Sequence, residues 1–208
     1  MGRYYTVSGV AEALLKIEGS KFIAEAAPVF SEEEAGATLA AVRKKYFDAT
    51  HHCYAYAVGE DRALSHYSDD GEPSGTAGIK IFSTLQSRDL SDVIVVVTRY
   101  FGGTKLGVGG LGRAYHDAAA AVLAEAHTIQ RLPVQHFTVV VEYTYVSPVM
   151  SLANRLSAFI DDAQYAEKVT FSLFTPHAAA DELERQLIDM TKGTALITRG
   201  GRTIRSVV

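Results

Sequence analysis

A run of apolar, mostly β-branched residues is followed by a stretch rich in glycine and then by a segment rich in alanine. The apolar run is 92–98 (DVIVVVT), the glycine-rich stretch is 98–115 (TRYFGGTKLGVGGLGRAY), and the alanine-rich segment is 114–126. A short continuous apolar run is typical of a buried strand, and the last segment favours a helix, which we expect over 112–126. Because glycine weakens the interior of both kinds of element, the stretch between them is predicted to be a long strand-to-helix loop.

The glycine-rich stretch also carries positive charge among backbone amides that no side chain shields. Amides of this kind bind anions, and the start of the following helix adds a partly positive end. We therefore predict a site for an anion, in particular a phosphate. Its predicted residues are Arg99, Gly102, Gly103, Lys105, Gly109, Gly110 and Arg113.

Two nucleotide-binding motifs come close to matching this stretch. Residues 107–112 (GVGGLG) fit GxGxxG. However, eight residues, 99–106, separate this motif from the strand, and the segment 127–132 lacks the acidic residue that a dinucleotide site requires. A P-loop needs Lys followed by Ser or Thr, where this chain has Val108 and Gly109. We expect no cofactor. A purely structural alternative, in which the glycines only allow tight packing, stays open.

A second glycine-studded stretch, 69–78 (DDGEPSGTAG), gathers three carboxylates and two hydroxyls. Three interpretations are open: the acids pair with cations of the first stretch and hold the loops together, they form a solvated turn, or they bind Mg²⁺ or do acid–base work. No metal site is assigned. The predicted site-lining residues are Asp69, Asp70, Glu72, Ser74 and Thr76.

Histidines and aromatic residues complete the predicted lining of the site. His51 and His52 precede Cys53 in a predicted strand, where neighbouring side chains point to opposite faces, so His52 and Cys53 are a poor nucleophile–base pair. Tyr100, Phe101 and Tyr115 lie close to cations, a mixture that stacks bases and contacts phosphates, although packing against the sheet is the alternative. No catalytic residue is assigned.

Composition excludes several classes of protein. Hydrophobic residues make up 48% of the 208 residues, enough for a sizeable core, and the formal net charge of -4 excludes a general polycation. A single cysteine excludes an intrachain disulfide and suits a reducing cytoplasm, which is the predicted location. No window is long and apolar enough to span a bilayer, so no membrane association is expected.

The pattern of elements predicts an α+β protein with two domains, 1–133 and 134–208. The first begins with a hairpin over 6–27 and a helix capped by Ser31 with Glu34 at the capping-box spacing. A strand over 52–58 and a short helix over 79–85 precede the glycine-rich stretch. The second domain is predicted to alternate strands and helices, which is the order of a ferredoxin-like sandwich. Its strands are expected over 137–145, over 167–174 and from 194, and its helices over 147–160 and 175–191.

Three long strings resemble the YigZ/IMPACT family. They are 49–56 (ATHHCYAY), 68–78 (SDDGEPSGTAG) and 97–115 (VTRYFGGTKLGVGGLGRAY). The resemblance implies an N-terminal domain like the second domain of ribosomal protein S5 and a ferredoxin-like C-terminal domain like the last domain of elongation factor G. Eukaryotic relatives regulate translation through protein contacts, and the family brings no established catalytic activity.

These observations predict a translation-associated, non-enzymatic binding protein. Its partner would be RNA, the ribosome or a translation factor, bound through the basic glycine-rich loops of the N-terminal domain. An enzyme acting on a small phosphorylated or nucleotide substrate is the main alternative, and a protein-interaction module using the C-terminal sheet is a third. The sequence leaves the oligomeric state open.

Overall fold

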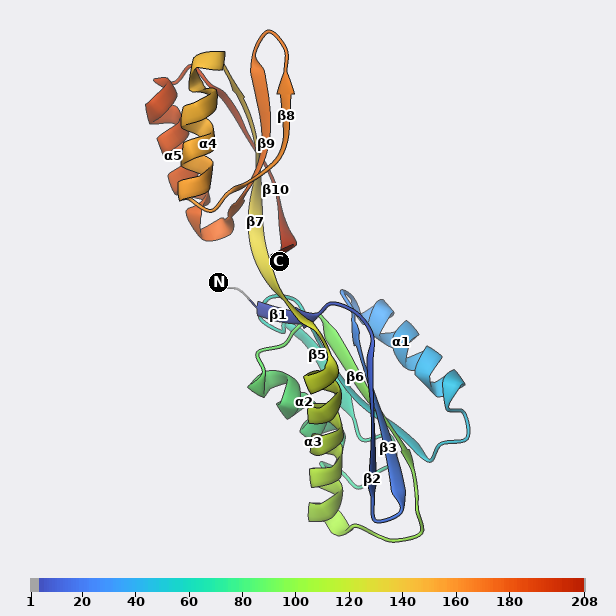
Figure 1. Cartoon of the computed structure of the whole chain (residues 1–208). Helices are drawn as coiled ribbons and strands as arrows, with labels where there is room; N and C mark the ends of the chain where they lie inside the picture. The colour runs from blue at the N-terminus through green and yellow to red at the C-terminus, as the bar shows by residue number, and fades with distance from the viewer. Residues whose placement is uncertain (1–3, 208) are drawn as a thin grey trace. The chain divides into compact units, whose positions relative to one another are not determined.

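A computed structural model describes residues 4–207, which form two compact units. The first unit extends to Gln130 and the second begins at Arg131, within strand β7 (Thr128–Val141). Each unit has its own hydrophobic core. The two-domain α+β class predicted from the sequence is confirmed (Figure 1).

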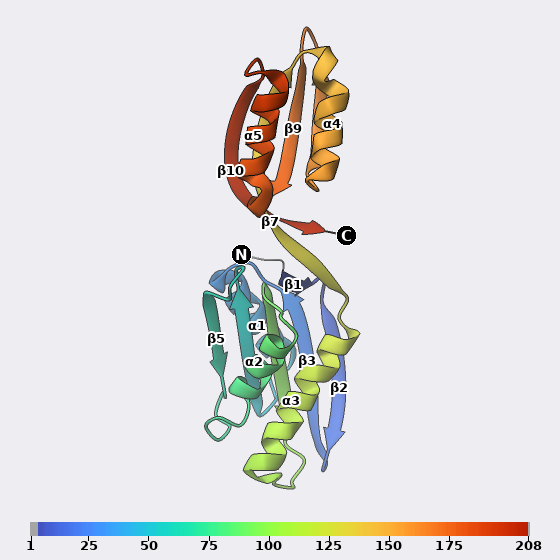
Figure 2. The same cartoon turned by 90° about the vertical axis from the view of Figure 1, so that its left-hand side faces the viewer.

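The N-terminal unit is a five-stranded antiparallel sheet with helices on both faces. The sheet order is β2-β3-β6-β4-β5. Helices α2 and α3 cover one face and α1 alone covers the other (Figures 1 and 2). The elements are β1 (Tyr4–Val7), β2 (Ala11–Ile17), β3 (Ser20–Pro28), α1 (Glu32–Lys45), β4 (His51–Val58), β5 (Leu64–Ser68), α2 (Gly78–Ser87), β6 (Val93–Tyr100) and α3 (Gly107–Glu125).

Strand β4 shows how alternation assigns side chains to the two faces. Cys53 and Ala55 are fully buried in the core beneath α2 and α3, while Tyr54 and Tyr56 lie on the α1 face. The small side chains allow close approach of a helix, as the sequence predicted. At the start of α2, a Cβ added to Gly78 would lie 2.7 Å from backbone atoms of Ser68 in β5.

The C-terminal unit has the β-α-β-β-α-β order of a ferredoxin-like fold. Its sheet places β7 between β9 and β10, with β8 beyond β9, and α4 and α5 cover one face (Figure 1). After β7 come α4 (Val146–Arg155), β8 (Phe159–Tyr165), β9 (Val169–Pro176), α5 (Ala180–Thr191) and β10 (Leu196–Val207), with short 3-10 turns at Tyr143–Tyr145 and His177–Ala179.

The structure corrects the glycine-rich loop, because α3 begins at Gly107 and not at Gly112. The glycines from 107 to 112 therefore form the first turns of the helix. Leu111 is buried, and a Cβ added to Gly112 would lie 3.4 Å from Lys80 Cε on α2. Packing against α2 offsets the low helix propensity of glycine, roughly 1 kcal/mol for each residue.

Two other helix boundaries were wrong, and two strands were missed. The helix expected to reach residue 160 ends at Arg155, because Ser157 adopts a left-handed conformation (φ 53°) and β8 follows. Pro176 is the last residue of β9, so α5 begins at Ala180 after a 3-10 turn. Strands β5 and β8 were missed because their mostly exposed residues show no apolar alternation.

No helix among the described residues has the length and apolar character needed to cross a membrane.

Gly78→Ala should destabilise the protein, since the new methyl group collides with backbone and not with a movable side chain. We expect a loss of about 1–3 kcal/mol in the free energy of unfolding measured in urea. Gly36→Ala is the matched control, because Gly36 lies inside α1 with no atom within 4 Å of the added Cβ. The control should gain about 0.5–1 kcal/mol, and equal effects of the two changes would contradict the packing argument.

Candidate functional site

The first turn of α3 lies between two hollows. The Arg99 hollow has a volume of about 340 Å³ and is lined by Glu72, Pro73, Arg99, Phe101, Lys105, Leu106, Gly107, Val108 and Leu111. The Arg113 hollow, of about 430 Å³, is lined by Gly75, Lys80, Ser83, Val108, Gly109, Gly112, Arg113 and His116. Val108 belongs to both hollows, so the two adjoin along the start of α3.

The N-terminus of α3 is open. The residue before the helix is Leu106, whose side chain makes no capping hydrogen bond. The amides of the first helical turn have no acceptor within a helix, and glycine at 107, 109 and 110 leaves them unshielded. Helix starts of this kind bind anions readily, so this turn supplies amide donors to both hollows.

Arg99 and Glu72 form a buried ion pair that joins the two glycine-rich stretches. Arg99 Nη1 donates to Glu72 Oε1 at 2.7 Å, and only 7% and 4% of the two side chains are exposed. The hydroxyl of Tyr115 donates to the same carboxylate oxygen at 2.8 Å. The guanidinium lies 5.4 Å from the ring centroids of both Phe22 and Phe101. This geometry fixes Arg99 as a structural member of the site wall.

The three predicted cations do not meet at one point. Arg99 lines its hollow, but Glu72 already compensates its charge. Lys105 is exposed in the same hollow, while exposed Arg113 lines the other. Neither Lys105 nor Arg113 has an ion-pair partner within 4–207. A fourth cation, Lys80 of α2, also lines the Arg113 hollow. It was not predicted from the sequence, because its position opposite Gly112 depends on the packing of α2 on α3.

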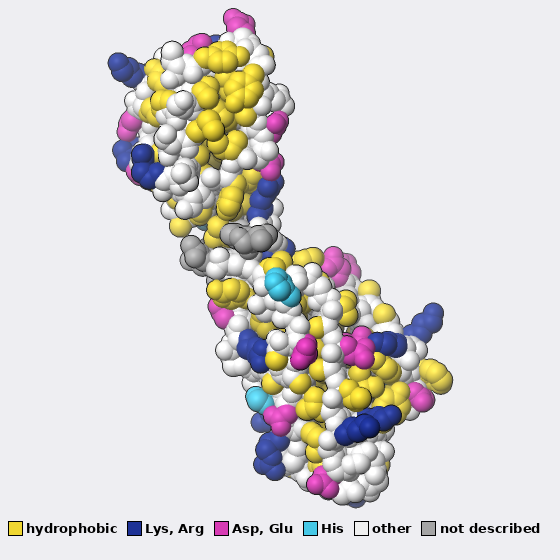
Figure 3. All heavy atoms as spheres, in the orientation of Figure 1, with side chains coloured by type: hydrophobic (Ala, Val, Ile, Leu, Met, Phe, Trp, Pro, Cys, Tyr) yellow, Lys and Arg dark blue, Asp and Glu magenta, His cyan; other side chains and the backbone are white. Residues whose placement is uncertain are grey.

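Exposed Lys80, Lys105 and Arg113 surround the first turn of α3, which lies at the lower end of the N-terminal unit in the orientation of Figures 1 and 3. This concentration is local, because the chain as a whole carries a formal net charge of -4. A local positive patch attracts anions within about 10 Å at moderate salt, the distance over which charges remain unscreened.

Asp69 and Asp70 organise the acidic stretch internally. The Asp69 carboxylate accepts hydrogen bonds from the amides of Gly75, Ala77 and Gly78, at 2.9, 2.8 and 2.8 Å, and so binds the start of α2. Asp70 accepts from Arg43 at 2.7 Å and from the amide of His52 at 2.7 Å. With Glu72 bound to Arg99, the structure favours the interpretation in which the acids hold the loops.

The histidines are also held by backbone groups. His51 Nδ1 lies 2.8 Å from the carbonyl oxygen of Asp70, and its Nε2 lies 3.9 Å from Glu72 Oε1. His52 is buried, and its Nε2 lies 3.1 Å from the carbonyl oxygen of Tyr46. Neither histidine is among the residues that line the two hollows.

The remaining predicted residues are divided between packing and the surface. The amide of Gly102 donates to Ser20 Oγ at 3.1 Å, and a Cβ there would lie 1.9 Å from the Gly19 carbonyl carbon, so Gly102 packs against the β2–β3 turn. Tyr100 donates to Asp48 at 2.7 Å, and buried Tyr115 packs edge-on against Phe22. Thr76 is buried and donates to the carbonyl of Pro73, whereas Ser74 and Gly103 are exposed.

The described part of the chain contains no group of three or more His, Cys, Asp or Glu residues arranged to hold a metal ion. The carboxylates of Asp69, Asp70 and Glu72 are directed at separate protein donors and not at a common point.

Comparisons with known proteins agree with this architecture. The family model for the Impact N-terminal domain matches residues 18–123, and the model named Domain of unknown function (DUF1949) matches 139–194. The IMPACT family member YvyE of Bacillus subtilis is 33% identical over 200 residues, which are 96% of this chain and 92% of that protein.

A eukaryotic relative and a solved structure are also similar. Protein IMPACT of Mus musculus is 38% identical over 93 residues, covering 42% of this chain and 29% of the mouse protein. A crystal structure of an hypothetical protein matches with a TM-score of 0.66 and 29% identity, covering 97% of this chain and 98% of that one. The similarity to YvyE and to this solved structure thus includes both units.

Glu72→Gln should destabilise the N-terminal unit strongly, because it leaves the Arg99 guanidinium buried without its counter-charge. We expect a loss of about 3–5 kcal/mol in urea unfolding, partly recovered when Arg99→Met is added. Glu142→Gln is the control, since the Glu142–Lys168 pair is about half exposed. Its effect should stay below about 1 kcal/mol. A loss for Glu72→Gln no larger than for the control would show that the buried pair is dispensable.

Cys53 should be unreactive in the folded protein. Burial is the main cause that raises the pKa of its thiol, and the nearby carboxylates raise this pKa further. The Sγ atom also donates a hydrogen bond to the carbonyl oxygen of Asp69 at 2.9 Å. Reactive cysteines need an accessible thiolate. An aromatic disulfide reagent at mildly alkaline pH should modify Cys53 only after urea unfolding, and rapid labelling of the folded chain would refute this assignment.

Proposed function

This chain belongs to the IMPACT family, and on that premise we propose that it is a translation-associated protein that binds RNA, free or within the ribosome. The family resemblance supports the association with translation. The surface around the first turn of α3 supports RNA as the ligand. Arg99 and Glu72 shape this surface, and three other cations supply its uncompensated charge.

The observation that carries the proposal is the pair of adjoining hollows on either side of this turn. Lys105 borders one hollow, Lys80 and Arg113 border the other, and none of the three has an ion-pair partner within 4–207. The unshielded amides of the turn lie between them. An extended ligand with successive phosphates matches such an arrangement, because each phosphate meets a cation or an amide donor.

Phe101 adds a means of contacting bases. Its ring is 47% exposed, lines the Arg99 hollow and has the Arg99 guanidinium 5.4 Å from its centroid. Stacking of bases on exposed aromatic rings is the usual contact in single-stranded RNA recognition and does not depend on sequence. Phe101 therefore takes the stacking role, since Tyr115 is buried and Tyr100 is bonded to Asp48.

An enzyme acting on a small phosphorylated or nucleotide substrate is the second candidate. The observation in its favour is the Arg99 hollow, whose volume of about 340 Å³ suits a small ligand and whose lining includes a buried carboxylate and guanidinium. Against it, the Glu72 carboxylate already accepts two hydrogen bonds, from Arg99 and Tyr115. Saturable displacement of RNA by uridine monophosphate would favour this candidate.

The salt dependence of RNA binding tests the proposal. A fluorescent oligouridylate of about 12 nucleotides, a length within the usual site sizes, is titrated by anisotropy across about 50 to 200 mM KCl. Lys80→Ala, Lys105→Ala and Arg113→Ala should each weaken binding and lower the slope of log K against log salt by about 0.7.

Lys44→Ala is the matched control, because Lys44 is exposed on α1, on the opposite face of the sheet. The control should keep the affinity and slope of the parent. The proposal fails if the three variants behave like Lys44→Ala, or if the parent shows no salt-dependent RNA binding.

A further inference from the structure

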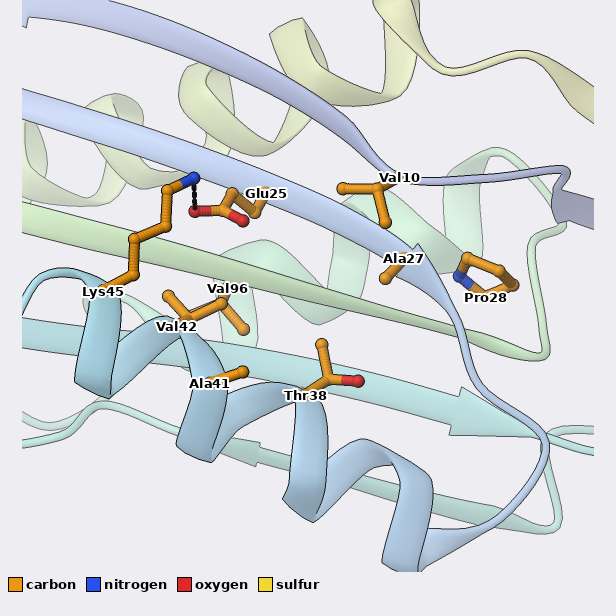
Figure 4. A pocket seen from close by; sticks show the side chains of 9 residues that line it. All are labelled: Val10, Glu25, Ala27, Pro28, Thr38, Ala41, Val42, Lys45 and Val96. Carbon is orange, nitrogen blue, oxygen red and sulfur yellow. Dashed lines mark hydrogen bonds and ion pairs between the residues drawn. The ribbon is translucent and has the colours of Figure 1, made fainter.

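Helix α1 covers only the middle of its face of the sheet and leaves a hollow on each side. Figure 4 shows the first, of about 380 Å³, between α1 and β3. Its lining is mainly apolar, and Lys45 closes one end by pairing with Glu12 at 2.7 Å and Glu25 at 2.9 Å. Nothing in this lining indicates the chemistry of an occupant.

The hollow on the other side of α1 has a distinct chemistry. It has a volume of about 200 Å³ and is lined by Glu32, Ala35, Gly36, Leu39, Tyr54, Tyr56 and His66. We call it the aromatic hollow. It lies on the opposite face of the sheet from the α3 surface, so the inference drawn from it is independent of the proposed RNA site.

The pairing of β4 with β5 brings three rings together. Tyr56 lies directly opposite His66 in the antiparallel register, and Tyr54 lies one position further along the same face. The two tyrosine rings are nearly parallel, with centroids 6.5 Å apart. The His66 ring lies 5.8 Å from the Tyr54 ring and 6.1 Å from the Tyr56 ring, tilted to both.

A carboxylate from α1 lies beside these rings. Glu32 is exposed in the first turn of the helix, and its Oε1 accepts a hydrogen bond from the Tyr56 hydroxyl at 3.1 Å. The lining contains no lysine or arginine to neutralise it. Aromatic faces together with a carboxylate form the environment that attracts organic cations.

Gly36 keeps the aromatic hollow open. It lies in the interior of α1, where glycine is less favourable than alanine, and no atom lies within 4 Å of a Cβ added there. Crowding therefore does not require glycine at this position. A longer side chain would extend into the space beside Tyr54 and Tyr56.

We propose that the aromatic hollow binds the cationic end of an arginine or lysine side chain presented by a partner protein. The volume of about 200 Å³ is smaller than that of sites which enclose whole small molecules, roughly 300–1,000 Å³. It suits the end of a side chain whose backbone stays outside. Glu32 provides the complementary charge, and the rings of Tyr54, Tyr56 and His66 provide the apolar contact.

A peptide titration followed by NMR tests this site. The tripeptide acetyl-Ala-Arg-Ala-amide is added to the ¹⁵N-labelled full chain, with the citrulline peptide, neutral and of the same shape, as the control. The arginine peptide should shift the amide signals of Gly36, Tyr54, Tyr56 and His66 and bind at least about fivefold more tightly than the citrulline peptide. Equal binding of the two peptides, or no shifts at these residues, overturns the proposal.

Two matched pairs of variants separate binding from folding. Gly36→Leu should fill the hollow and abolish the shifts while the protein stays folded, whereas Ala40→Leu at an exposed position of the same helix should bind like the parent. Tyr54→Leu should weaken binding about three- to thirtyfold. Tyr67→Leu, on the other face of β5 against Phe82, should not weaken it. Unchanged binding by Gly36→Leu would refute the site.

Discussion

The buried pair of Arg99 and Glu72 is the interaction on which the N-terminal unit depends. Arg99 is the last residue but one of the central strand β6, and Glu72 belongs to the acidic stretch, so their contact joins two segments that lie apart in the sequence. Burying opposite charges is favourable only when hydrogen bonds and packing compensate the lost hydration. Here Tyr115 and the rings of Phe22 and Phe101 complete that environment. The wall of the Arg99 hollow is consequently held by buried contacts.

The glycines at the start of α3 have different surroundings. Gly112 lies against α2, where an added Cβ would lie 3.4 Å from Lys80 Cε, whereas a Cβ added to Gly107 or Gly109 would lie 3.9 Å or more from every side chain except those of the adjacent residues. Packing and amide exposure thus belong to different glycines of one stretch, so the structural and the functional interpretations of that stretch are compatible.

The sequence predicted well those elements whose patterns are local. Alternation in β4 assigned Cys53 and Ala55 to one face, and Ser31 caps α1 by accepting from the Glu34 amide at 3.2 Å. The partner of the Glu34 carboxylate is the amide of Phe30, one residue earlier than a capping box requires. Long-range contacts were harder to predict. The sequence offered pairing of the acids in the second glycine-studded stretch with cations as one of three interpretations, but it did not identify Glu72 as the partner of Arg99. It also did not place Lys80 opposite Gly112, because both contacts depend on how distant elements pack.

The Asp69 carboxylate makes the starts of α2 and α3 differ in the amide donors that they offer to an anion. The amides of Gly75, Ala77 and Gly78, at and just before the start of α2, donate to it, so this helix terminus is bound by a carboxylate of the chain itself. The start of α3 has no such tethered acid in its capping position, which is occupied by Leu106. Of these two helix starts, that of α2 is bonded to a carboxylate of the chain itself, whereas that of α3 keeps its amide donors available for the anionic ligand that we propose.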